Sequence, residues 1–269
     1  MKLNVSKTKT VVFSLAPSPS IIPALKLDGN LIEEVETFKY LGAWVDRKLR
    51  WNVNTKKRIS AAKQALGTLS RCRHYLPSFV TRLVYKTIIL PKFLYATPIT
   101  YPKNKHDQIA FEYVNKYAAS LISDCHTGSY EDCIRSAKLD PVWKIVVERR
   151  LSLFRAYVDE HRFLPKELLH SKKQTASRSG LRSGAVINAN ENKQQFEKPI
   201  SSQRQQCEDT ALNAMVNNWN KLPNTIVNLS PSSFKQRIKS GEIVKFLIEI
   251  KVINPLEVPV RKPTWNVKK

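Results

Sequence analysis

Apolar and polar residues follow two different periods along this chain, and the change falls near residue 51. Before it, apolar residues lie in short β-branched or alternating runs, which predict strands in residues 5–14 and 37–46. Asp28-Gly29 lies between two further short runs and predicts a hairpin turn. So few strands cannot make a sheet with two covered faces. This β unit must therefore pack on the helices that follow or form the edge of a larger sheet.

Beyond residue 51, apolar residues recur at three- and four-residue spacing, which is typical of amphipathic helices. A first helix is predicted from Asn52, and its buried stripe is Ile59, Ala62, Leu66 and Leu69. A second is predicted from Ser78, kinked or ended by Pro91. Its expected buried face is Val80, Leu83, Val84, Thr87 and Ile88. Further helices are predicted at residues 106–123, 130–137 and 142–160, so the fold class is α+β and mainly α.

Residues 171–206 lose this periodicity and are rich in Ser, Gln, Lys, Arg and Asn, which predicts a flexible linker or long loop. Order returns near Glu208, and a last helix is predicted near residues 232–250. The expected organisation is a short antiparallel β unit, a helical domain, the linker and a helical tail, at residues 1–51, 52–170, 171–206 and 207–269.

Charge adds the strongest indication of a partner. Lys and Arg number 45 against 22 Asp and Glu, a formal net charge of +23. Such an excess indicates a polyanion, with nucleic acid before an anionic membrane surface. A membrane-surface role is the weaker alternative, because the basic helices lack a clear Trp, Phe or Leu face for insertion.

No acidic residue lies between Asp46 and Asp107, whereas ordinary surface helices mix both signs. This unmixed stretch predicts a phosphate-binding face. The residues expected to contact nucleic acid are Arg47, Lys48, Arg50, Lys56, Lys57, Arg58, Lys63, Arg71 and Arg73. Interleaved rings are candidates for stacking on bases, although burial in a core is the open alternative for each. They are Trp51, His74, Tyr75 and Tyr85.

No set of residues predicts catalysis or metal binding by this chain alone. A polymerase or nuclease needs converging carboxylates on a divalent metal. The acidic residues of the β unit read instead as surface groups: Asp28, Glu33, Glu34, Glu36 and Asp46. Cys125, His126 and Cys133 supply three potential zinc ligands, but a closed site needs four. No Gly-x-Ser-x-Gly motif or Gly-rich phosphate loop is present.

The cysteines and the hydropathy indicate the cellular compartment and whether the chain crosses a membrane. Cys72, Cys125, Cys133 and Cys207 are scattered without a Cys-x-x-Cys pair, which predicts reduced thiols and a nuclear or cytoplasmic location. No apolar stretch approaches the roughly 18 residues of a membrane span, so no membrane partner is expected. Nothing in the pattern indicates the oligomeric state.

Three stretches together resemble one family, the reverse transcriptases of non-LTR retrotransposons. The segment from Leu3 to Lys9 resembles the family's Leu-x-(Leu/Ile)-Asn-x-x-Lys-Thr palm motif. The segment from Phe38 to Asp46 resembles its Tyr-Leu-Gly primer-grip segment at the palm–thumb junction. The run Trp219-Asn220-Lys221-Leu222-Pro223, followed by Ser233-Phe234-Lys235, is similar to a C-terminal block of jockey- and CR1-like elements.

The resemblance implies specific roles for each part of the chain. The β unit would be the end of the palm and the acid-free helices the thumb, which holds an RNA–DNA or DNA duplex by its backbone. Lys7 would lie close to the incoming nucleotide as an accessory group, and Tyr40, Leu41 and Gly42 would place the primer's 3′ end. By residue chemistry alone, Lys7 reads as a solvated strand-end lysine, and Tyr40 to Gly42 as a packed strand end.

One departure from the family limits the expected activity. Members carry a Phe/Tyr-Ala-Asp-Asp motif shortly before the Asn-x-x-Lys-Thr segment and another catalytic Asp upstream, and this sequence contains neither. We therefore expect no polymerisation by this chain alone and no cofactor, since Mg²⁺ and nucleotide binding would require the missing palm. The alternatives are a stand-alone basic protein that binds duplex or RNA, derived from such an element, and part of a larger active enzyme.

Overall fold

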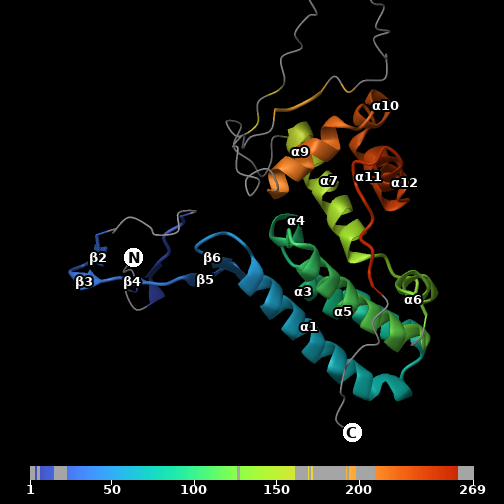
Figure 1. Ribbon diagram of the computed structural model, residues 1–269, viewed down its shortest axis with the longest axis horizontal. Coiled ribbons are helices and arrows are strands. Elements are labelled where there is room, and N and C mark those ends of the chain that lie inside the picture. The colour runs from blue at the N-terminus through green and yellow to red at the C-terminus, as the bar shows by residue number, and fades with distance from the viewer. Residues whose placement is uncertain are drawn as a thin grey trace, which may run out of the picture. The chain divides into compact units, whose positions relative to one another are not determined.

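The computed structural model describes residues 4, 7–14, 23–125, 128–160, 169, 171, 192, 194–197 and 210–259. It confirms the α+β, mainly helical fold class (Figure 1). The chain forms two compact units. Unit 1 comprises residues 1–139 with 258–269, and unit 2 comprises residues 140–257.

Short strands in three separate pairs make up the β part of unit 1. They are β1 Lys9–Thr10, β2 Lys26–Leu27, β3 Asn30–Leu31, β4 Glu33–Glu34, β5 Thr37–Tyr40 and β6 Ala43–Asp46. Strands β1 and β4 pair in parallel, while β2–β3 and β5–β6 are antiparallel hairpins. The predicted hairpin at Asp28-Gly29 is confirmed, with φ of 50° and 80° at its two central residues.

The strands predicted at residues 5–14 and 37–46 are both longer than the strands in the structure. Within the described part of residues 5–14, only Lys9 and Thr10 form a strand, because only they pair with β4. The strand predicted at residues 37–46 is instead the β5–β6 hairpin, with Tyr40 opposite Ala43. Its turn places Leu41 and Gly42 at φ of 45° and 86°, a backbone that glycine adopts without steric cost.

Helices form the rest of unit 1. They are α1 Asn52–Cys72, the 3₁₀ turn η2 Arg73–Tyr75, α2 Ser78–Val84, the π-helical η3 Tyr85–Ile89, α3 Leu90–Phe93, α4 Thr97–Thr100, α5 Lys105–Ser123 and α6 Tyr130–Ser136. The stripe predicted on the first helix is confirmed at Ala62, Leu66 and Leu69, which are buried, while Ile59 is half-buried. They face a core in which the rings of Phe93 and Phe111 stack 4.7 Å apart.

The buried face predicted for the second helix is wrong. Thr81, Tyr85 and Ile89 are buried there, whereas Leu83 and Ile88 are 56% and 51% exposed. The chain passes from α2 through the π-helical segment into α3, and the buried face is offset from the predicted one already at Thr81 in α2. Pro91 does not end the helical path but lies at the start of α3, directly after the π-helical segment.

A polar network lies inside unit 1 between α5, α6 and η3. The Tyr130 hydroxyl donates to the Glu112 carboxylate, and the Tyr85 hydroxyl donates to Asn115 Oδ1 at 2.8 Å. Asn115 Nδ2 lies 3.4 Å from the Tyr130 hydroxyl. Burial, and then the charge of Glu112, raise the pKa of both tyrosines far above its ordinary value. Both therefore stay protonated as donors.

Unit 2 packs helices around Trp219. Its helices are α7 Val142–Glu160, α9 Ala211–Asn220, α10 Asn224–Val227, α11 Pro231–Lys239 and α12 Glu242–Glu249. The single helix predicted at residues 232–250 is two helices, because the chain turns at Gly241 with a φ of 77°. The Trp219 ring is fully buried, with the centroids of Phe154 and Phe234 at 5.4 and 5.9 Å.

Most of the predicted linker, residues 171–206, lies outside the described residues. Those of its residues that are described lie against unit 2. Trp219 Nε1 donates to the Gln194 carbonyl at 2.9 Å, and Asn192 donates to the Trp219 carbonyl at 2.8 Å. Asn220 bonds both the N–H and the carbonyl of Phe196. The Trp-Asn pair of the third resembling stretch therefore holds this segment in place.

Candidate nucleic-acid interface

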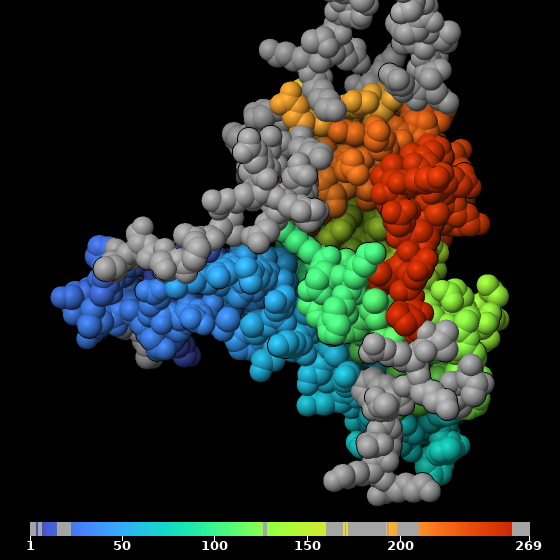
Figure 2. Space-filling model, in the orientation of Figure 1, coloured from blue at the N-terminus to red at the C-terminus, as the bar shows by residue number. Residues whose placement is uncertain are grey.

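Helix α1 carries the clearest basic surface of the described chain. Lys56, Lys57, Lys63 and Arg71 are exposed, on the side of the helix away from Ala62 and Leu66. At about 1.5 Å rise per residue the helix is roughly 30 Å long, so these charges are spread along it. Figure 2 shows α1 on the surface of unit 1.

A built turn leads into this helix and presents further positive charge. The Asp46 carboxylate accepts hydrogen bonds from the backbone N–H groups of Lys48, Arg50 and Trp51 at 3.0, 3.1 and 2.9 Å. Lys48 and Arg50 are exposed, and Arg47 is half-buried. Asp46 was predicted to be a surface carboxylate. Its side chain instead organises this turn through these three hydrogen bonds.

Arg58 has a different role from its neighbours on α1. Its guanidinium donates to the carbonyl of Gly42 at 2.7 Å and to that of Lys92 at 3.1 Å, and it lies 4.8 Å from the centre of the Tyr95 ring. The Tyr95 hydroxyl donates to the Leu41 carbonyl at 2.7 Å. Burial lowers the pKa of Arg58, but an arginine remains charged at neutral pH. Arg58 and Tyr95 therefore clamp the β5–β6 turn to α1 and α3.

This clamp supports the segment that resembles a primer grip. Tyr40 and Leu41 are 62% and 75% exposed, so the turn projects two large side chains into solvent while its carbonyls are bonded underneath. Tyr95 had no sequence signal, because a tyrosine far along the chain shows no pattern that ties it to a turn. Its role follows only from the tertiary contact.

Two other predicted residues have partners within the protein. Arg73 forms an ion pair with Asp124 at the end of α5, and its side chain is 19% exposed. The Lys57 ammonium lies 5.5 Å from the centre of the Trp44 ring. This cation–π contact orients the side chain, which is still exposed. Lys7 is exposed, and its N–H donates to the Asn4 side chain at 3.3 Å in a local turn.

The candidate stacking residues divide into two groups. Tyr75 is 88% exposed and His74 is exposed, so both are open to a partner. Trp51 is half-buried at the start of α1. Tyr85 is fully buried in the polar network and cannot stack on a base. Phe79, 62% exposed and close in sequence to Tyr75, is a candidate that the periodicity did not indicate.

Replacing Arg58 with alanine should release the β5–β6 turn. Two charge-assisted hydrogen bonds are lost, which we expect to cost about 1–2 kcal/mol in the free energy of unfolding of unit 1. Hydrogen exchange should accelerate at residues 41–44. Lys56→Ala, at an exposed position on the same helix, is the matched control and should leave these amides unchanged. Equal exchange in both variants would mean that Arg58 does not hold the turn.

No family model, curated protein or solved structure matches this chain. Within the described residues, no group of three or more His, Cys, Asp or Glu side chains is arranged to hold a metal ion. Across the same part of the chain, no helix has both the length and the apolar character that crossing a bilayer requires.

Proposed function

We propose that this chain binds the backbone of a nucleic-acid duplex along α1 and the turn before it, as the thumb-like part of a non-LTR retrotransposon reverse transcriptase. The observation that carries the proposal is the unmixed charge of this surface. Lys48, Arg50, Lys56, Lys57, Lys63 and Arg71 are exposed in a stretch with no acidic residue. Like charges on one helix repel each other and destabilise it, and a bound polyanion offsets that repulsion.

The geometry beside this surface supports the same proposal. The turn Tyr40-Leu41-Gly42 projects from the end of β5 and is fixed to α1 by Arg58. A duplex whose phosphates lie along α1 would therefore bring a strand end toward a rigid, exposed turn. This is the arrangement that the resemblance to a primer grip calls for. The proposal assigns binding to the chain and no chemical step.

The salt dependence of binding tests the proposal. Affinity for a short RNA–DNA hybrid, measured by fluorescence anisotropy, should fall linearly with salt on logarithmic axes, by about 0.9 for each phosphate neutralised. The triple variant Lys56→Glu, Lys57→Glu and Lys63→Glu should reduce the magnitude of that slope by roughly 2.7. Its circular dichroism spectrum should match the unaltered chain, since these side chains are exposed.

A second triple variant removes the same net charge elsewhere. Lys235→Glu, Lys239→Glu and Lys245→Glu alter exposed lysines of α11 and α12. These changes should leave the slope nearly as it is. If both variants lower the slope equally, binding follows net charge and not α1. Single-stranded RNA bound as tightly as the hybrid would contradict a duplex-binding surface.

A further inference from the structure

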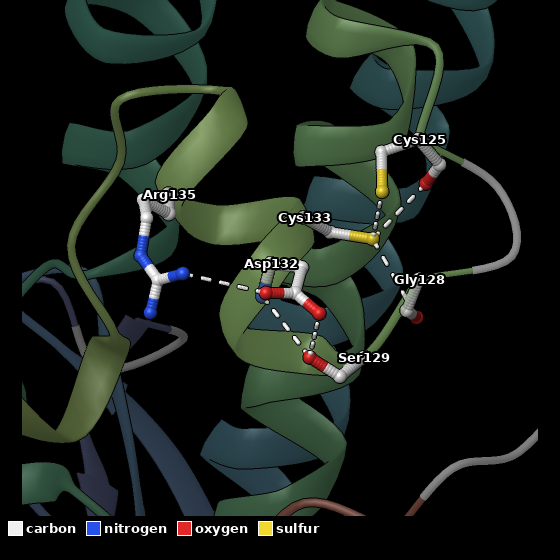
Figure 3. Close-up of polar contacts among 6 residues, drawn as sticks. All are labelled: Cys125, Gly128, Ser129, Asp132, Cys133 and Arg135. Atoms are coloured by element: carbon white, nitrogen blue, oxygen red, sulfur yellow. Dashed lines mark hydrogen bonds and ion pairs between the residues drawn. The ribbon is translucent and has the colours of Figure 1, made fainter.

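Two cysteines that are separate in the sequence meet where α5 passes into α6 (Figure 3). Helix α5 ends at Ser123, and the next residue, Asp124, has a φ of 55° that turns the chain away. Helix α6 begins after Ser129, whose hydroxyl accepts from the Asp132 N–H at 3.1 Å and donates to the Asp132 carboxylate at 2.7 Å. These two caps set Cys125, just past α5, against Cys133 inside α6.

The contact between the two thiols is close and enclosed. Cys133 Sγ lies 2.8 Å from Cys125 Sγ and 3.1 Å from the Cys125 carbonyl oxygen. Gly128 covers the pair, because a Cβ at this position would stand 2.7 Å from Cys125 Sγ and 3.5 Å from Cys133 Sγ. The buried Lys116 ammonium donates to the Gly128 carbonyl at 3.2 Å and holds that backbone in place.

We propose that Cys125 and Cys133 form an oxidation site, in which a hydroperoxide converts the two thiols into an intramolecular disulfide. The sulfur atoms need to approach by less than about 1 Å to reach the bond length of about 2.04 Å. The facing caps of α5 and α6 already hold both backbones. The inference does not depend on the nucleic-acid proposal.

The chemistry balances in two steps. The Cys125 thiolate attacks one peroxide oxygen and the O–O bond breaks, so that Cys125 becomes a sulfenic acid. The departing hydroxide or alkoxide takes up the proton that the Cys125 thiol released and leaves as water or an alcohol. Cys133 sulfur then attacks Cys125 sulfur, and the S–O bond breaks. The departing hydroxide takes the Cys133 proton and leaves as water. The two thiols lose two electrons, and the hydroperoxide gains them.

The surroundings assign the order of the two cysteines. Cys125 is half-buried and reachable by a small oxidant, whereas Cys133 is fully buried. Burial, then the hydrogen bond with Cys125, raise the pKa of Cys133 to about 11, while the nearby Lys116 ammonium opposes the shift. Cys133 therefore stays a thiol at neutral pH and reacts second, as the resolving residue.

The disulfide would link the end of α5 directly to α6. Asp124, next to Cys125, is the partner of Arg73 at the end of α1. Oxidation would thus fix the corner that joins α1, α5 and α6. The sequence analysis grouped Cys125 and Cys133 only as potential zinc ligands, because their spacing matches no disulfide or redox motif, and the two helix caps bring them together in the fold.

Peptide mapping of the peroxide-treated full chain tests this site. Both cysteines lie in one tryptic peptide, residues 117–135, since no Lys or Arg falls between Lys116 and Arg135. After limited hydrogen peroxide, denaturation and alkylation, this peptide should lose both alkylation sites and the mass of two hydrogen atoms. Dithiothreitol should restore both sites. Cys72, which is exposed, is the internal control and should remain alkylated in the chymotryptic peptide 70–75.

Two variants distinguish a disulfide favoured by the fold from nonspecific oxidation of the two thiols. In Cys133→Ser, Cys125 should stop at the sulfenic acid, which dimedone traps. In Gly128→Ala, the added methyl group should displace Cys125 Sγ and reduce the fraction of disulfide formed. Independent oxidation of Cys125 and Cys133 in the unaltered chain would overturn the proposal. So would a Cys72 that loses its thiol as readily as the pair.

Discussion

Replacing Trp219 with alanine should lower the free energy of unfolding of unit 2 by about 3–5 kcal/mol, the range for a large aromatic removed from a core. The ring is fully buried against Phe154 and Phe234, and its Nε1 donates to the Gln194 carbonyl. The variant leaves a cavity and an acceptor without its donor. A domain has only about 5–15 kcal/mol of stability, so this loss is a large fraction of the stability of unit 2.

Hydrogen exchange followed by mass spectrometry gives the readout for each unit separately. In Trp219→Ala, peptides from α7, α9 and α11 should lose protection, and those from α5 should keep it. Trp219→Phe keeps an aromatic ring but not the N–H, so it should cost less, about 1–3 kcal/mol. Unchanged protection in α9 of the alanine variant would mean that Trp219 is not central to this core.

Replacing Tyr130 with phenylalanine should destabilise unit 1 by about 1–3 kcal/mol or more, because the buried Glu112 carboxylate loses a hydrogen-bond donor. Glu112 has no exposed surface, so water cannot replace the hydroxyl. The double variant Glu112→Leu with Tyr130→Phe removes both partners and should be less destabilised than the sum of the single changes. Urea denaturation of the four proteins measures this coupling. Strict additivity would show that the two groups do not interact.

The same network predicts how stability changes with alkaline pH. The pKa of Tyr130 is raised in the folded chain, mainly by burial and then by Glu112, and the unfolded value is near 10. The folded state therefore binds more protons above that pH, and the free energy of unfolding should fall as pH rises beyond about 10. Tyr130→Phe should make this fall shallower, and Tyr85 and Cys133, whose pKa values are also raised by burial, should contribute to what remains. Urea midpoints measured from pH 8 to 11 test the sign.

Local patterns in the sequence were sufficient where one element decides its own structure. The fold class, the Asp28-Gly29 hairpin and the first helix with its buried stripe were all predicted. The errors fall where a residue depends on a distant partner. The polar hydroxyl of Tyr85 can be buried because it donates a hydrogen bond to Asn115. The spacing of apolar residues does not show that pairing. Thr37 to Asp46 looks like one strand until Leu41 and Gly42 take positive φ.

The candidate interface shows the same division. A charge count along α1 finds its exposed lysines, since exposure follows from helical spacing. It cannot separate Arg58, which bonds the Gly42 carbonyl, or Arg73, which pairs with Asp124, from neighbours that face solvent. Cys125 and Cys133 were expected as reduced thiols, and were considered together only as potential zinc ligands with His126. The described cysteines are free thiols, and the contact between these two is a product of the fold.

The clamp beneath the β5–β6 turn also constrains how this chain can diverge. Gly42 has a φ of 86°, which strains any residue with a Cβ, whereas the neighbouring Tyr95 ring would be in ordinary contact with that Cβ. Tyr95 in turn stacks on Arg58, and both bond the turn. Replacing Arg58 or Tyr95 leaves a carbonyl of the turn without its donor, and replacing Gly42 strains the turn that both side chains hold. Positions 42, 58 and 95 should therefore change together across related sequences, whereas Tyr40 and Leu41 above them remain free to vary with whatever they touch.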